Sequence, residues 1–313
     1  MKHNANKKGF TLIELLVVMS IIALLLSILM PALGRARAEA MLTKDSTQVK
    51  AIQGGFNMYA AGNDGKYPIP GLEARLPGSS GQLIKGRGPE NLNENDHAAA
   101  LSMSIMQELF SSSILISPTE GGDFVFPVEG YDFNVYEPAP TGSGWTLWDD
   151  SFVNDLDSGC NNSYGIMPIS GKRKANNWGT SSHSPTTFAV IGNRGPIDGI
   201  ADKRSKGNFM HGIDAEWMGP VAFGDGHTET LKTFYPISTT YISDSGAAAS
   251  DNIFLEEEDQ AIDNDYMPNG LSLGQGADVV LTHIKGGSEG DQGMEGDATD
   301  QGKGGGASAF THD

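Results

Sequence analysis

Cysteine and basic residues are both scarce in this chain of 313 residues. The single cysteine, Cys160, excludes an internal disulfide and any CxxC metal or redox site. Asp and Glu outnumber Lys and Arg by 39 to 21, which gives a formal charge of −18. Because a nucleic-acid binder needs a basic surface to neutralise phosphates, we expect no nucleic-acid partner.

Apolar residues are also few, at 38% of the chain, where soluble domains average about 45–50%. The 41 glycines indicate many turns and loops. Together these values argue against a long helical bundle and against a protein that crosses the membrane many times. The sequence contains no HExxH motif and no Walker phosphate loop, and we do not expect an enzyme.

One long apolar run is nevertheless present, from Phe10 to Leu33, and Glu14 is its single charged residue. About 20 apolar residues at ~1.5 Å each span a bilayer core, so the run is long enough for a transmembrane helix. Three interpretations compete. The run could be a signal peptide cleaved near Ala38–Ala40, a simple membrane anchor, or a helix whose acid has a dedicated partner. A signal peptide usually has only ~7–15 apolar residues, and an unpaired carboxylate in hydrocarbon is costly.

The third interpretation agrees with a family signature. The sequence KKGFTLIELL at residues 7–16 resembles the type IV prepilin signature, in which a Gly and a Phe are followed by three residues and a Glu. In that family a membrane aspartyl protease, the prepilin peptidase, cuts after the Gly and methylates the new terminal amine. The resemblance therefore implies cleavage between Gly9 and Phe10, N-methylation of Phe10, and a kink at Pro31.

The chemistry of Glu14 agrees with this resemblance. A carboxylate in hydrocarbon needs a cation or a hydrogen-bond donor, and no basic residue lies between Phe10 and Gly34. Cleavage would create an amine at Phe10, and in a filament Glu14 could pair with this amine on a neighbouring subunit, which would fix the register. Alternatively, Glu14 reaches the lipid headgroups, and Pro31 ends the membrane span instead of bending it.

Helical periodicity continues beyond the apolar run. Gly62–Gly65 then stops the helix, and Gly54 and Gly55 weaken it locally. The apolar stripe consists of Leu42, Val49, Ile52, Phe56 and Tyr59. We therefore divide the chain into a leader (1–9), a transmembrane helix (10–33), an amphipathic helical spine (34–62), a head (63–285) and a disordered tail rich in Gly and acidic residues (286–313).

The head is predicted to mix a helix with short strands. A second helix is expected from Asp96, as the N-cap, to Phe110. The Asp225-Gly226 pair predicts a tight hairpin in which both residues adopt a positive φ. The candidate strands are residues 113–117, 124–128, 186–191, 221–223, 228–234 and 279–282.

Three stretches of the head resemble a pseudopilin-like group that is abundant in planctomycetes. They are YAAGNDGKYP at 59–68, NSYGIM at 162–167 and FGDGH at 223–227. That group carries a His, about nine residues, and then Asp-Gly. Here His211 precedes Asp225 and Gly226 with a gap of thirteen residues, which a four-residue insertion in 212–220 would explain. The longer gap leaves the role of His211 open.

The acidic composition raises the question of calcium. Major pseudopilins of type II secretion systems bind Ca²⁺ in a late loop, so the resemblance suggests Asp198, Asp202 and Asp214 as ligands. The sequence contains no EF-hand pattern. The simpler interpretation is that the acidic side chains form a solvated surface, and we otherwise expect no cofactor.

These observations predict an α+β fold of the type IV pilin kind, with a long N-terminal helix packed on a small antiparallel sheet. We expect a single-pass inner-membrane protein with a cytoplasmic N-terminus and a periplasmic head. Its partners would be the prepilin peptidase and other pilin or pseudopilin subunits, in a type II secretion pseudopilus or a type IV pilus. The alternative is a membrane-anchored periplasmic binding protein or hydrolase that uses the segment only for export.

Overall fold

The computed structural model divides into two compact units, Met1–Thr43 and Lys44–Asp313. It describes residues 10–137, 146–156, 158–170, 173–180, 188–196, 199, 205–212, 216–237, 239–242, 248–254, 265–266, 272–273, 281 and 283. The helical elements are α1 (Leu12–Gly62), α2 (Pro70–Glu73), η1 (Leu92–Glu94), α3 (His97–Met106), η2 (Ser112–Leu115), η3 (Phe133–Val135), η4 (Arg173–Asn177) and α4 (Lys206–Phe209). The strands are β1 (Asn154–Asp155), β2 (Gly159–Cys160), β3 (Tyr164–Ile166), β4 (Ala189–Asn193), β5 (Gly219–Phe223), β6 (Thr228–Leu231), β7 (Thr240–Ile242), β8 (Ala248–Ser250), β9 (Asp265–Tyr266) and β10 (Ser272–Leu273).

The helix α1 is continuous from Leu12 to Gly62, close to the predicted limits. Its second half buries one face, as the stripe predicted, although Leu42 is only half-buried. The helix ends where the backbone turns left-handed at Asp64 and Gly65, and Gly65 N donates to Ala60 O at 3.0 Å. Its buried residues are Asp45, Gln48, Val49, Ile52, Gln53, Gly55, Phe56, Tyr59 and Ala60.

The main sheet is an antiparallel meander of four strands in the order β3-β4-β5-β6. All five residues of β4 and all five of β5 are buried, because these two strands form the centre of the sheet. A β-bulge interrupts the pairing of β4 with β5 between Ala189 and Ile191. The remaining strands form three two-stranded ladders, β1-β2, β7-β8 and β9-β10.

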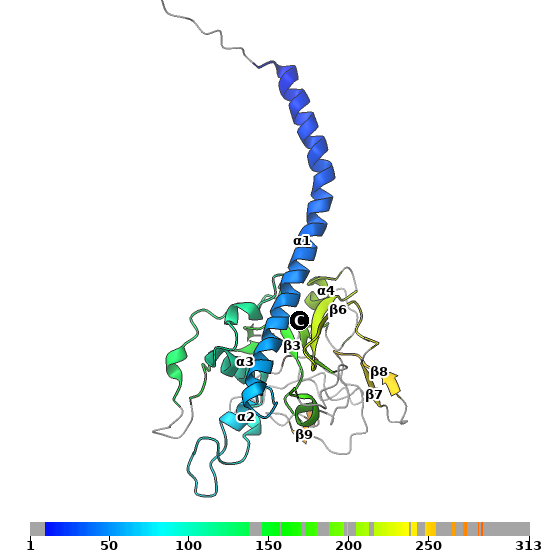
Figure 1. The fold of residues 1–313 in the computed structure, drawn as a ribbon. Coiled ribbons are helices and arrows are strands. Elements are labelled where there is room, and N and C mark those ends of the chain that lie inside the picture. The colour runs from blue at the N-terminus through cyan, green and yellow to red at the C-terminus, as the bar shows by residue number, and fades with distance from the viewer. Residues whose placement is uncertain are drawn as a thin grey trace, which may run out of the picture. The chain divides into compact units, whose positions relative to one another are not determined.

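The main hydrophobic core lies where the second half of α1 packs on this sheet (Figure 1). Val49, Ile52 and Phe56 of α1 share one buried cluster with residues of β3, β4 and β5. Phe56 also contacts the rings of Tyr67 and Trp178, at centroid distances of 5.9 and 5.5 Å. The predicted α+β fold, with a helix packed on a small antiparallel sheet, is thus confirmed.

The hairpin between β5 and β6 is present, but its turn differs from the prediction. Gly226 has a φ of 86°, whereas Asp225 does not enter the left-handed region. Gly226 N donates to Phe223 O at 2.8 Å, and Phe223 N donates to His227 O at 3.0 Å. The loop therefore has three residues and ends in one left-handed glycine, so only Gly226 needs a positive φ.

Several other boundaries differ from the sequence prediction. Asp96 is the N-cap of α3 and accepts a hydrogen bond from Ala99 N at 2.7 Å, but the helix ends at Met106 and not at Phe110. In the predicted strand 113–117, residues 113–115 belong to the 3₁₀ turn η2 and the last two form no strand. In 124–128 only Val125 pairs, in a single bridge to Cys160. β4 begins three residues and ends two residues later than predicted, β6 ends at Leu231, and most of 279–282 lies outside the described residues.

Candidate functional site

The N-terminal end of α1 carries the predicted processing and assembly residues. Phe10 is exposed, and Gly9 lies outside the described residues. Glu14 Oε2 accepts hydrogen bonds from Thr11 N at 2.9 Å and from Thr11 Oγ1 at 2.8 Å. In return, Thr11 Oγ1 accepts from Glu14 N at 3.2 Å. This reciprocal pair is a capping box, so Glu14 also caps the helix that contains it.

The apolar part of α1 is exposed in the described part of the chain. Every residue from Phe10 to Ala40 is exposed, including Leu12 at 81% and Leu33 at 70%. α1 is long and apolar enough to cross a membrane, and no other helix among the described residues is. Pro31 lies inside the helix and does not end it, although a proline removes one backbone hydrogen bond.

The second half of α1 carries a buried carboxylate, Asp45, that sequence analysis did not identify. Its side chain is fully buried and accepts hydrogen bonds from four side chains. Tyr164 and Asn193 are cross-strand partners on β3 and β4, so both reach the same helix residue. The distances to Asp45 are 2.5 Å from Tyr164 Oη, 2.8 Å from Asn193 Nδ2, 3.0 Å from Ser117 Oγ and 2.6 Å from His211 Nε2. We call these five residues the Asp45 cluster.

The Asp45 cluster contains His211, whose role the sequence had left open. His211 pairs with Asp45 and not with Asp225, and the side chain of His211 is only 3% exposed. An ionised carboxylate only accepts hydrogen bonds, so His211 Nε2 must carry the proton in this contact. Burial and the charge of Asp45 raise the pKa of Tyr164, which keeps its hydroxyl protonated as a donor.

The same geometry does not form a catalytic triad. In a triad the base uses one ring nitrogen for the acid and the other for the nucleophile. Here Nε2 of His211 faces both Asp45, at 2.6 Å, and Thr119 Oγ1, at 3.4 Å. Burial raises the pKa of the Cys160 thiol to about 12, so this cysteine is a protonated core residue and not a nucleophile.

The three stretches that suggested the pseudopilin-like group meet on α1. Tyr67, in the first stretch, donates from its hydroxyl to Gly224 O in the third stretch at 3.2 Å. Burial raises the pKa of Tyr67 to about 12, and the nearby Asp225 adds to the shift. Tyr164, in the second stretch, reaches Asp45. These tyrosines therefore hold the helix, the hairpin and the sheet together.

Asp225 and Gly226 form the exposed turn of the hairpin. Asp225 Oδ1 accepts from His227 N at 3.0 Å and also contacts His227 Nδ1 at 2.5 Å. Partial burial raises the pKa of Asp225, but the hydrogen bonds from His227 and the nearby His227 ring together lower it below its usual value. The His227 ring stacks on Phe223 with centroids 4.5 Å apart. These contacts stabilise the turn.

The structure does not test the calcium prediction. Asp198, Asp202 and Asp214 all lie outside the described residues. Among the residues that the structure does describe, no three His, Cys, Asp or Glu side chains form a group that could hold a metal ion.

The sequence contains a signal for each of two features that the prediction missed, the capping box of Glu14 and the buried Asp45. Thr11-Leu12-Ile13-Glu14 has the spacing of a capping box. Asp45 lies four residues before Val49, on the same helical face as the apolar stripe. A charge on a buried face indicates paired donors, but the donors themselves are far away in the sequence.

Comparison with known proteins identifies the N-terminal segment. A family model described as the prokaryotic N-terminal methylation motif matches residues 4–30. No curated protein and no solved structure matches the chain. The chain therefore carries the N-terminal motif of a type IV pilin-like precursor. The resemblance of the head to the planctomycete-type group stays a prediction.

Proposed function

We propose that this protein is a structural subunit that is cleaved between Gly9 and Phe10, methylated at Phe10, and assembled through α1 into a pseudopilus or a pilus. The observation that carries the proposal is the methylation motif at residues 4–30, which overlaps the first half of α1, where every described side chain from Phe10 to Ala40 is exposed. Such a surface must be covered by lipid before assembly and by neighbouring helices after it.

Glu14 would guide the assembly step. The capping box uses its Oε2 atom, and in the described part of the chain Oε1 accepts no hydrogen bond. This second oxygen is available to the methylated amine of a neighbouring Phe10. A paired charge in hydrocarbon contributes specificity of register more than net stability, which suits a filament that must add subunits in one position.

The prepilin peptidase, the inner membrane and other pilin or pseudopilin subunits are the partners in this proposal. The N-terminus would face the cytoplasm, where the peptidase acts, and the head would face the periplasm. Both the pseudopilus of a type II secretion system and a type IV pilus fit the same chemistry. Shearing cells distinguishes the two filaments, because a surface pilus is released while a pseudopilus stays inside the envelope.

Mass spectrometry of the polypeptide purified from its native membrane tests the processing step. The expected N-terminus is N-methylated Phe10, with residues 1–9 absent. A protein that begins at Met1, or near residue 41 after signal-peptide cleavage, would overturn the proposal.

Substitution of Glu14 tests the assembly step. Glu14→Gln keeps the capping box, because Gln also serves at this position, but removes the charge. We expect Glu14→Gln and Glu14→Ala to insert in the membrane normally, and both to be depleted at least tenfold from sedimentable filaments. If Glu14→Gln assembles as well as the natural chain and only Glu14→Ala fails, Glu14 acts as a helix cap and the proposed pairing is wrong.

A further inference from the structure

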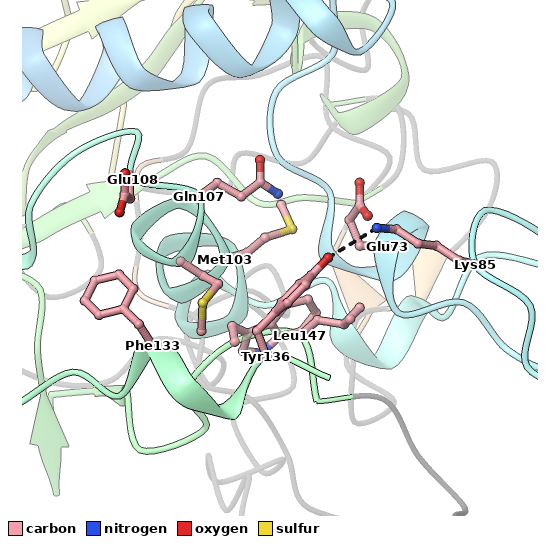
Figure 2. A pocket seen from close by; sticks show the side chains of 10 residues that line it. Glu73, Lys85, Met103, Gln107, Glu108, Phe133, Tyr136 and Leu147 are labelled. Carbon is pink, nitrogen blue, oxygen red and sulfur yellow. Dashed lines mark hydrogen bonds between the residues drawn. The ribbon is translucent and has the colours of Figure 1, made fainter. Parts of the chain in front are cut away.

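The head contains a pocket of about 500 Å³ that the proposed function does not use (Figure 2). This volume is within the usual range for small-molecule sites, about 300–1,000 Å³. Its walls come from α2, α3, η3 and the loop residues around them. The lining residues are Glu73, Lys85, Met103, Met106, Gln107, Glu108, Phe133, Tyr136, Leu147 and Trp148.

The floor of the pocket is the second hydrophobic cluster of the head. Met103, Leu147 and Trp148 are buried there, with 2%, 9% and 6% of their surfaces exposed. Phe133 and Tyr136 line the opening and are about half exposed. Thioether and aromatic groups are polarizable and adapt to flat apolar ligands, and aromatic faces also attract cations.

The rim carries Glu108 in a conformation that glycine usually adopts. Glu108 follows the end of α3 with a φ of 55°. Glu108 N donates to Ile105 O at 2.9 Å, and Leu109 N donates to Ser104 O at 3.1 Å. These two bonds define a Schellman motif, whose left-handed position is normally Gly. The backbone of Glu108 is therefore strained, because a residue with a Cβ atom occupies a left-handed conformation.

The charges around the pocket favour a cationic ligand. Of the two carboxylates, Glu73 already accepts from Tyr59 Oη at 3.0 Å. Lys85 Nζ donates to Tyr136 Oη at 3.2 Å, and Figure 2 shows Lys85 on the opposite side of the pocket from Glu108. Within the described part of the chain, the Glu108 carboxylate has no hydrogen bond or ion pair. Glu108 is therefore a carboxylate without a hydrogen-bond partner among the described residues, at an apolar opening.

We propose that this pocket binds a small organic cation with an apolar, preferably aromatic, body. The body would fill the space above Met103 and Leu147, and the ammonium group would face Glu108. The inference does not depend on filament assembly, because every residue involved belongs to the head.

Three indole compounds with different charges test the proposal: tryptamine (a cation), tryptophol (neutral) and indole-3-propionate (an anion). The full chain, with ¹³C-labelled methionine methyl groups, is titrated in nonionic micelles and followed by NMR. We expect saturable shifts of the Met103 and Met106 signals, with affinity in the order tryptamine, tryptophol, indole-3-propionate. Met19 and Met30 lie in the apolar segment and report partition into the micelle.

Two variants of Glu108 separate its charge from its backbone role. Glu108→Gln should reduce the preference for tryptamine over tryptophol by about two- to fivefold, the size expected for an exposed charge pair. Glu108→Gly should lose the same preference while melting at a higher temperature, because glycine relieves the left-handed strain. Glu229→Gln, an exposed carboxylate on β6, is the control and should change nothing.

Three results would each overturn the proposal. Shifts limited to Met19 and Met30 would mean partition into micelles and no site in the head. Equal affinity for the three indoles, or an unchanged tryptamine preference in Glu108→Gln, would mean that the pocket does not select cations. None of these three outcomes would bear on cleavage at Gly9 or on assembly.

Discussion

Asp45 is the residue whose environment differs most from what its type suggests. An isolated buried carboxylate is strongly unfavourable, and four donors offset the loss of water around this one. Those donors come from four segments that are far apart in the sequence. The Asp45 cluster therefore forms only when helix, sheet and loops are all in place, which favours one packing over others.

Removal of one donor should destabilise the head. His211→Ala leaves part of the Asp45 charge unpaired, and we expect a loss of about 1–3 kcal/mol in the free energy of unfolding. His227→Ala is a matched control, because His227 also pairs with an aspartate but its side chain is 42% exposed. We expect a change below about 1 kcal/mol for the control.

Urea denaturation followed by circular dichroism measures both histidine variants. Equal effects of the two substitutions would mean that burial does not strengthen the pairing of His211 with Asp45. If both variants unfold at the same urea concentration as the natural chain, the Asp45 cluster does not contribute measurably to the stability of the head.

At the scale of elements, the packing of α1 against the segment after α3 explains one of two adjacent glycines that lower the helix propensity of α1. A Cβ atom at Gly55 would lie only 2.6 Å from Cδ1 of Phe110, in the segment after α3. A Cβ atom at Gly54 would meet no atom within 4 Å. Gly55 therefore permits a close approach, whereas Gly54 only weakens the helix.

These adjacent glycines give opposite predictions. Gly54→Ala should stabilise the protein by about 0.5–1 kcal/mol, the usual gain in a helix interior. Gly55→Ala should destabilise it by about 1–3 kcal/mol, because Phe110 must move and the core around Phe56 must adjust. Thermal melting monitored by circular dichroism measures both changes, and a gain in both variants would show that the contact at Phe110 is easily relieved.

On the scale of the whole molecule, the chain consists of two units with different needs. In the first unit, Met1–Thr43, the apolar residues from Phe10 to Ala40 are exposed, so this unit depends on lipid or neighbouring subunits. The second unit, from Lys44 onward, contains both hydrophobic clusters and the Asp45 cluster. Asp45, the first fully buried residue of α1, lies just after this boundary.

Truncation tests this division. A chain that begins at Ala40 retains the whole buried face of α1 and should unfold cooperatively in water without detergent. A chain that begins at Val49 lacks Asp45 and Gln48, and we expect its melting temperature to be at least about 5 °C lower. Differential scanning calorimetry compares the two, and an unfolded product from Ala40 would contradict an independently stable head.

The sequence alone was sufficient where local chemistry determines the structure. A run of 24 residues with one charge, preceded by Lys-Lys-Gly, determined the first helix and its methylation motif. The N-cap at Asp96 and the Asp-Gly hairpin depend on neighbours within a few residues, so they were also predictable. Short strands such as β4 were placed two to three residues early, because strand limits depend on pairing with distant segments.

Only the tertiary structure determined the rest. The partners of Asp45, the contact that needs Gly55, and the pocket beside Glu108 all join residues separated by tens of positions. The conformation of Glu108 shows the same limit, since its type gives no hint of a left-handed backbone. Local patterns determine helices and turns, but which buried groups meet follows from the packing of the whole head.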